Sequence, residues 1–108
     1  MMNQAKRQRL EQKGWKVGSA RELLQLSDEE VTYIELKLAL GDQLKATREK
    51  RAVTQVELAK RMSSSQSRVA KMESGDPSVS IDLLVKALLA LGATRKQIAV
   101  AVAPARAV

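Results

Sequence analysis

Apolar residues recur at intervals of three and four along the middle of the chain, the spacing of a helix that buries one side. Ser27 precedes the first such stretch and Glu30 lies three residues after it, which is the capping-box pattern of a helix start. The pattern predicts a helix from residue 28 to about Arg51, in which Gly41 is expected to mark a kink or a break. The apolar positions are 31, 34 and 38 in one row and 33, 36, 40 and 44 in another.

The same signals recur further along the chain. Thr54 with Glu57, and Thr94 with Gln97, are two more capping-box patterns, and Gly92 stands where a glycine C-cap is expected. Helices are therefore predicted over residues 55–62, 66–74, 81–91 and 95 to about 103. The last of these also alternates apolar residues as a strand does, but a short helix fits it better. No other segment has a strand pattern, so we expect an all-α fold, a compact domain of five helices.

Composition excludes several classes of chemistry. The 108 residues include no Cys and no His, which excludes thiol nucleophiles, disulfides, thiolate or imidazole metal sites and His-dependent triads. The acidic cluster at residues 28–30 is already explained by the positive end of a helix dipole. We therefore expect no catalytic residue, no cofactor and no metal, in a protein that is not an enzyme.

Charge points to a polyanionic partner. Nineteen Lys and Arg against twelve Asp and Glu give a net charge of +7. Residues 1–18 are interpreted as a basic N-terminal arm, either a solvated tail or an arm that follows the DNA backbone or minor groove. Trp15 is expected to anchor this arm by packing. A capping pattern at Ser19 and Glu22 begins a helical domain predicted over residues 19–103, and residues 104–108 are a tail.

The sequence gives no sign of a membrane or secreted protein. No apolar run approaches the ~20 residues of a membrane span. The N-terminal cations are not followed by the apolar stretch of a signal peptide. We expect a cytoplasmic protein with no membrane partner.

The stretch TQVELAKRMSSSQSRVAKMESG, residues 54–75, carries the clearest functional signal. It consists of two short predicted helices separated by a polar turn of serines. Two short helices that share one core at a steep angle make a helix-turn-helix. The residues predicted to form the shared core are Leu58, Ala59 and Met62 on the first helix and Val69 and Met72 on the second.

These residues resemble the Cro/repressor-type helix-turn-helix regulators, the Xre family, over roughly Leu44 to Leu91. The similarity lies in the T-Q-x-E-L-A opening at Thr54–Ala59, the apolar Val69 and the E-x-G ending at Glu73–Gly75. The resemblance implies a lambda-repressor-like fold and a transcriptional regulator that binds double-stranded DNA.

The resemblance also implies that Arg48 pairs with Glu73 and that Gln55 touches a phosphate. The chain departs from the family in the turn, where Gly and then an apolar residue are common and this sequence has Ser63 and Ser64. Because Ser adopts the left-handed conformation less readily than Gly, we expect modest strain or different dihedral angles there.

The second helix of the motif supplies the candidate base contacts. Its N-terminal face, capped by Ser65, enters the major groove in this family. Gln pairs bidentately with adenine and Arg with guanine, whereas Ser is permissive. For each cation the alternative is an ordinary solvated surface charge. The predicted base contacts are Gln66, Ser67 and Arg68; the base or phosphate contacts are Lys71 and Ser65; the phosphate contacts are Gln55, Lys60 and Arg61.

The stretch IDLLVKALLALG, residues 81–92, is apolar on more than one side, with Ile81, Leu84, Leu88 and Leu91 in one stripe and Leu83, Val85 and Leu89 outside it. A helix that is apolar all round needs a partner beyond one small domain. We therefore expect a homodimer through residues 81–102, with two reading helices about one DNA turn apart. The alternative is that the additional leucines pack under the helix at residues 31–40.

Three functions remain open. The first is a sequence-specific DNA-binding transcriptional regulator that represses its own operon. The resemblance also extends to HigA-type antitoxins, which bind a toxin protein and repress their operon, with Trp15–Leu26 as the candidate toxin contact. The third is a protein-interaction module without DNA specificity, in which the motif serves only as a scaffold.

Overall fold

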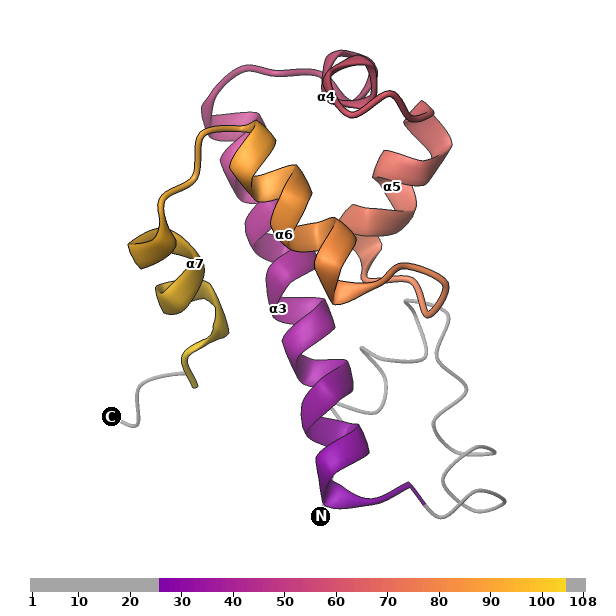
Figure 1. The fold of residues 1–108 in the computed structure, drawn as a ribbon, viewed down its shortest axis with the longest axis vertical. Coiled ribbons are helices and arrows are strands. Elements are labelled where there is room, and N and C mark those ends of the chain that lie inside the picture. Colours follow the sequence, from indigo (N-terminus) through magenta and orange to yellow (C-terminus); the bar gives the residue numbers. More distant parts are fainter. Residues whose placement is uncertain (1–25, 105–108) are drawn as a thin grey trace.

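The computed structural model describes residues 26–104, which form five α-helices and no strand (Figure 1). The helices are α3 (Asp28–Lys50), α4 (Gln55–Arg61), α5 (Gln66–Ser74), α6 (Ile81–Ala90) and α7 (Arg95–Val102). The predicted all-α fold is confirmed, and the helix ends lie within about a residue of those expected. The expectations for the basic arm, Trp15 and the Ser19 capping pattern lie outside the described residues, as do residues 105–108.

Each helix begins at a hydroxyl residue that satisfies its free backbone donors. Ser27, Thr54 and Thr94 form complete capping boxes, in which the cap side chain and the side chain three residues later each accept a backbone N–H. Ser65 and Ser80 accept a single backbone N–H. These local signals fix where the helices start, which is why the sequence located them correctly.

The expected break at Gly41 is wrong, because α3 runs without interruption from Asp28 to Lys50. The reason for glycine there is the close approach of α5. A Cβ atom at Gly41 would lie 2.7 Å from the carbonyl oxygen of Met72 and 3.0 Å from that of Glu73. The missing side chain therefore allows the C-terminal turn of α5 to lie directly against α3.

The core is built where α3, α5 and α6 meet, with α6 crossing in front of α3 in Figure 1. Leu84 and Leu88 of α6 are fully buried, as are Val69 and Met72 of α5. Each such side chain contributes about 1.5–3 kcal/mol through removal from water. The full core cluster is Leu40, Leu44, Val53, Leu58, Ala59, Val69, Met72, Val79, Leu84, Ala87, Leu88, Leu91 and Ala93.

Part of the excess apolar surface of α6 is covered within the chain. Leu83 and Val85, which lie outside the main stripe, are half-buried against the core. Leu89 instead keeps 52% of its surface exposed. The core of the same chain therefore partly buries two of the three additional side chains, and Leu89 remains exposed.

The turn between α4 and α5 adopts the left-handed conformation despite having no glycine. Ser63 has φ of 52°, which L-residues adopt at a cost. The expectation of modest strain at this serine therefore rests on an observed dihedral angle. At the other end of α5, Gly75 takes the same region with φ of 68°, where glycine is unstrained.

None of the helices in residues 26–104 combines the length and the apolar composition that crossing a membrane requires.

Candidate nucleic-acid interface

The helix α5 has a buried side and a polar outer side. Val69 and Met72 are fully buried, three residues apart, and join the face of α4 formed by Leu58 and Ala59. The side chains of the outer face are exposed: Gln66, Ser67, Arg68, Ala70 and Lys71. Because the inner residues hold the helix rigidly, the outer residues are presented on a fixed surface.

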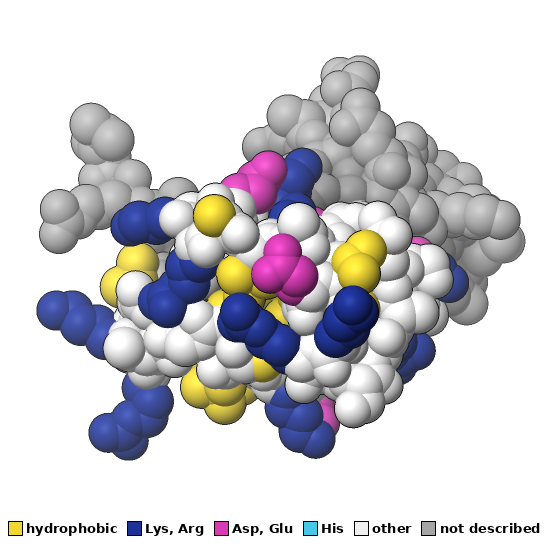
Figure 2. Space-filling model, turned by 90° about the horizontal axis from the view of Figure 1, so that it is seen from above, with side chains coloured by type: hydrophobic (Ala, Val, Ile, Leu, Met, Phe, Trp, Pro, Cys, Tyr) yellow, Lys and Arg dark blue, Asp and Glu magenta, His cyan; other side chains and the backbone are white. Residues whose placement is uncertain are grey.

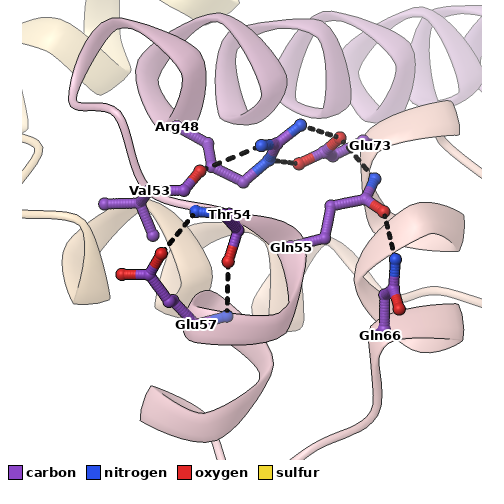
Figure 3. A network of polar contacts seen from close by, with 7 residues as sticks. All are labelled: Arg48, Val53, Thr54, Gln55, Glu57, Gln66 and Glu73. Carbon is purple, nitrogen blue, oxygen red and sulfur yellow. Dashed lines mark hydrogen bonds and ion pairs between the residues drawn. The ribbon is translucent and has the colours of Figure 1, made fainter.

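Hydrogen bonds connect the first residues of α4 and α5, although eleven positions separate them in the sequence (Figure 3). The Gln66 amide nitrogen Nε2 donates to Gln55 Oε1 at 3.4 Å. Gln55 Nε2 in turn donates to Glu73 Oε1 at 3.0 Å. The sequence placed both glutamines at the interface, and it gave no signal that they contact one another.

Glu73 is held in place by Arg48 of α3, as the resemblance implied. Arg48 Nη2 donates to Glu73 Oε1 at 3.1 Å, Arg48 Nε pairs with Glu73 Oε2, and Nη1 donates to the carbonyl oxygen of Val53 at 2.9 Å. Hydrogen bonding to Glu73 raises the pKa of Arg48 above its ordinary value. A charged pair this well buried is costly to break, because the remaining charge would lie unpaired in the interior.

In this network Gln66 keeps one hydrogen-bond donor and one acceptor that could contact adenine. An amide nitrogen carries two hydrogens, and one of them is directed to Gln55. The second hydrogen and the carbonyl oxygen remain for a bidentate contact with adenine N7 and N6. Gln55 therefore orients the side chain that is predicted to read a base.

A shallow hollow lies between the end of α3, the start of α4 and the start of α5. Its lining includes Arg48, Ala52, Thr54, Gln55 and Gln66. The end of α3 is thereby continuous with the surface formed by α4 and α5. Figure 2, which views the molecule from the α4 end, shows Lys and Arg side chains spread over this side and few acidic ones.

Residues 39–101, more than half of the chain, match the model of the helix-turn-helix domain. The chain belongs to the helix-turn-helix domain family. No curated protein and no solved structure gave a match. The matched range covers the C-terminal half of α3, the whole of α4, α5 and α6, and all of α7 except its last residue.

The remaining candidate residues at α5 differ in whether their side chains already form hydrogen bonds within the protein. The Ser65 hydroxyl accepts the backbone N–H of Arg68 at 3.2 Å, so it acts as the helix cap that the sequence predicted. Ser65 and Ser67 hydroxyls are also hydrogen-bonded to each other at 3.2 Å. Arg68 and Lys71 are exposed, and neither side chain forms an ion pair within residues 26–104.

The structure separates the predicted phosphate contacts into two groups. Gln55 is the first residue of α4 and lies beside Gln66. Lys60 and Arg61 are exposed in the last turn of α4, at the other end of that helix. Cations at that end also favour the helix dipole, so their position has a structural reason independent of DNA.

Sequence reasoning did not identify one group of exposed basic residues outside the helix-turn-helix motif. Lys50 and Arg51 end α3, and Arg95 and Lys96 begin α7. The clustered charges were visible in the sequence, but the approach of α3 to the turn before α7 was not.

Proposed function

We propose that this chain is a sequence-specific, double-stranded DNA-binding transcriptional regulator of the Cro/repressor (Xre) type. The outer face of α5 enters the major groove, where Gln66, Ser67 and Arg68 contact base edges. The observation that carries the proposal is the pairing of Gln66 with Gln55, because it orients an exposed amide at the start of a rigid, exposed helix. A side chain that is oriented before binding loses less conformational entropy on binding.

The remaining polar side chains supply affinity. Arg68 suits guanine O6 and N7, which two guanidinium N–H groups reach together. Lys71 and Ser65 contact a base or the adjacent backbone, and Lys60 and Arg61 contact phosphates. Phosphate contacts fix the register of the protein on the duplex and do not read sequence.

A homodimer through residues 81–102 is part of this proposal. The support is the apolar surface that α6 and α7 leave exposed: Leu89 at 52%, Val100 at 68% and Val102 at 36%. A two-fold dimer would cover such side chains and present two copies of α5 to adjacent turns of DNA. Analytical ultracentrifugation at micromolar concentration tests it, and a species of 11.9 kDa alone would contradict it.

The natural operator is proposed to lie upstream of the protein's own gene, so that the protein represses its own synthesis. Fluorescence anisotropy with that upstream fragment and with a scrambled duplex, over a series of salt concentrations, measures both affinity and specificity. A strong preference for the upstream fragment is expected. A duplex selected from a random library serves if the operator lies elsewhere.

Two variants with equal loss of charge separate base reading from general attraction. Arg68→Ala is expected to weaken binding to the preferred duplex by about 1–3 kcal/mol and to reduce the preference over scrambled DNA. Lys45→Ala removes an exposed cation from α3, outside both the proposed DNA surface and residues 81–102, and is expected to leave the preference unchanged. Equal binding of the wild type to both duplexes would contradict the proposal.

A further inference from the structure

A second group of cations lies beside the helix-turn-helix, where α3 ends and α7 begins. Lys50, Arg51, Arg95 and Lys96 are all exposed. Arg51 joins the two segments, because its Nη2 donates to the carbonyl oxygen of Gly92, forty-one positions away, at 3.5 Å. Arg95 follows only three residues after that glycine, so the fold gathers cations from two distant parts of the sequence.

None of these four side chains forms an ion pair within the described part of the chain. In residues 26–104 the recorded ion pairs join α3 to α5 and lie within α6. Arg95 and Lys96 also occupy the first turn of α7, which contains no acidic residue. Cations at the positive end of a helix dipole are unfavourable. An external anion would therefore reduce both the repulsion among the cations of this group and the repulsion between Arg95, Lys96 and the helix dipole.

The group is continuous with the proposed DNA surface. Arg51 is followed directly by Ala52, Val53 and Thr54, which line the hollow that also includes Gln66. Figure 2 shows basic side chains distributed across the α4 end of the molecule. A duplex whose major groove holds α5 continues past the protein on either side, with a phosphate every few ångströms along each strand.

We propose that Lys50, Arg51, Arg95 and Lys96 form a second DNA-contact surface that binds backbone phosphates flanking the bases read by α5. The inference rests on the proposed function and extends it by assigning a further site and its ligand, the phosphodiester backbone. Contacts of this kind add affinity and fix the orientation of the protein on the duplex, without selecting a sequence.

The test uses the double variant Arg95→Gln with Lys96→Gln in the full chain. Because both positions lie within residues 81–102, analytical ultracentrifugation first checks that the variant has the same oligomeric state as the wild type. The variant's binding to the preferred and to the scrambled duplex is expected to weaken by the same factor. The slope of log affinity against log salt is expected to decrease by about two for each bound protomer and by about four for the proposed dimer, so the advantage of the wild-type dimer shrinks roughly a hundredfold between 50 and 200 mM salt. The thermal midpoint is expected not to fall, because the substitutions remove cations from the positive end of a helix.

Two controls test whether the change in salt slope comes from this surface. Lys45→Gln removes an exposed cation on α3, outside residues 81–102, and is expected to leave the salt slope unchanged. The wild type is expected to bind a duplex with flanking base pairs more tightly than one trimmed to the selected site. The double variant is expected to lose that dependence on flank length.

The outcomes distinguish this surface from the function on which it rests. An unchanged salt slope in the double variant, with the sequence preference of the wild type intact, would overturn the second surface and leave the role of α5 standing. If the wild type shows no sequence preference, the proposed function fails, and the salt slope of the double variant still decides whether these residues contact phosphate.

Discussion

The helices α5 and α6 are similar in length, nine and ten residues, and each begins at a capping serine. Their inner faces are also alike, since both bury apolar side chains completely in the same core. They differ outside, where α5 exposes amide, hydroxyl and basic groups and α6 exposes an Asp82–Lys86 ion pair and the apolar Leu89. Two helices with similar buried faces can therefore differ in their outer residues alone, and it is the outer residues of α5 that support its proposed role in DNA binding.

The largest expected effect is on the inner face of α6. Leu84→Ala is expected to lower the free energy of unfolding by about 2–5 kcal/mol, because a fully buried side chain leaves a cavity in the centre of the core. Urea unfolding followed by circular dichroism measures it. Val56→Ala on α4, where the side chain keeps 44% of its surface exposed and lies outside residues 81–102, is the control, with a loss below about 1 kcal/mol. Equal losses at the two positions would contradict the burial described for α6.

The contact between α3 and the end of α5 gives the next effect. Gly41→Ala is expected to destabilise the protein by about 1–3 kcal/mol, because the added carbon meets backbone atoms of α5 that cannot move independently. Helix propensity alone predicts the opposite sign, a gain of about 1 kcal/mol. The direction of the shift in the thermal midpoint therefore distinguishes the two explanations, and a stabilised variant would refute the close approach.

On the outer face of α5, stability and DNA binding are expected to separate. Gln66→Ala should reduce the preference for the selected duplex, by about 1–3 kcal/mol if its base contact is lost. Its free energy of unfolding should change by less than about 1 kcal/mol, since the side chain is exposed. Anisotropy and denaturant unfolding on the same preparation measure both quantities. A variant that loses stability and keeps its preference would reverse the roles assigned to this face.

The smallest effect concerns the turn before α5. Ser63→Gly is expected to stabilise the protein by about 0.5–1 kcal/mol, because glycine adopts the left-handed conformation without strain and the gain is reduced by the greater freedom of glycine in the unfolded chain. A differential scanning measurement detects a shift of this size. The neighbouring Ser64→Gly is the control and is expected to give no gain, as Ser64 has no positive φ. Destabilisation by Ser63→Gly would show that the turn depends on the serine itself.

The sequence predicted the helices well, because their signals are local. A hydroxyl residue and a Glu or Gln three positions later satisfy the backbone donors of one turn, and this holds in any fold. The Arg48–Glu73 pair came from the resemblance to a family, and the structure confirms it. Gly41 was misinterpreted because helix propensity considers a helix by itself. This glycine is instead explained by the close approach of the α5 backbone, which leaves no room for a side chain.

The candidate site was predicted only as a set of exposed positions. The sequence placed Gln66, Ser67 and Arg68 away from the apolar side formed by Val69 and Met72, and the structure agrees that they are exposed. The contact from Gln55 to Gln66, and the approach of Arg51 to Gly92, depend on how whole helices pack. No local pattern encodes such approaches, so a single sequence could not predict them.

The most direct test of the account is an NMR titration of the ¹⁵N-labelled protein with its preferred duplex, following every backbone amide. The account predicts that the largest shift changes fall at the start of α5 and at the start of α4, around Gln66 and Gln55, with the outer face of α6 almost unaffected. Changes centred on α6, or a uniform small effect that scrambled DNA reproduces, would contradict the claim that α5 reads DNA.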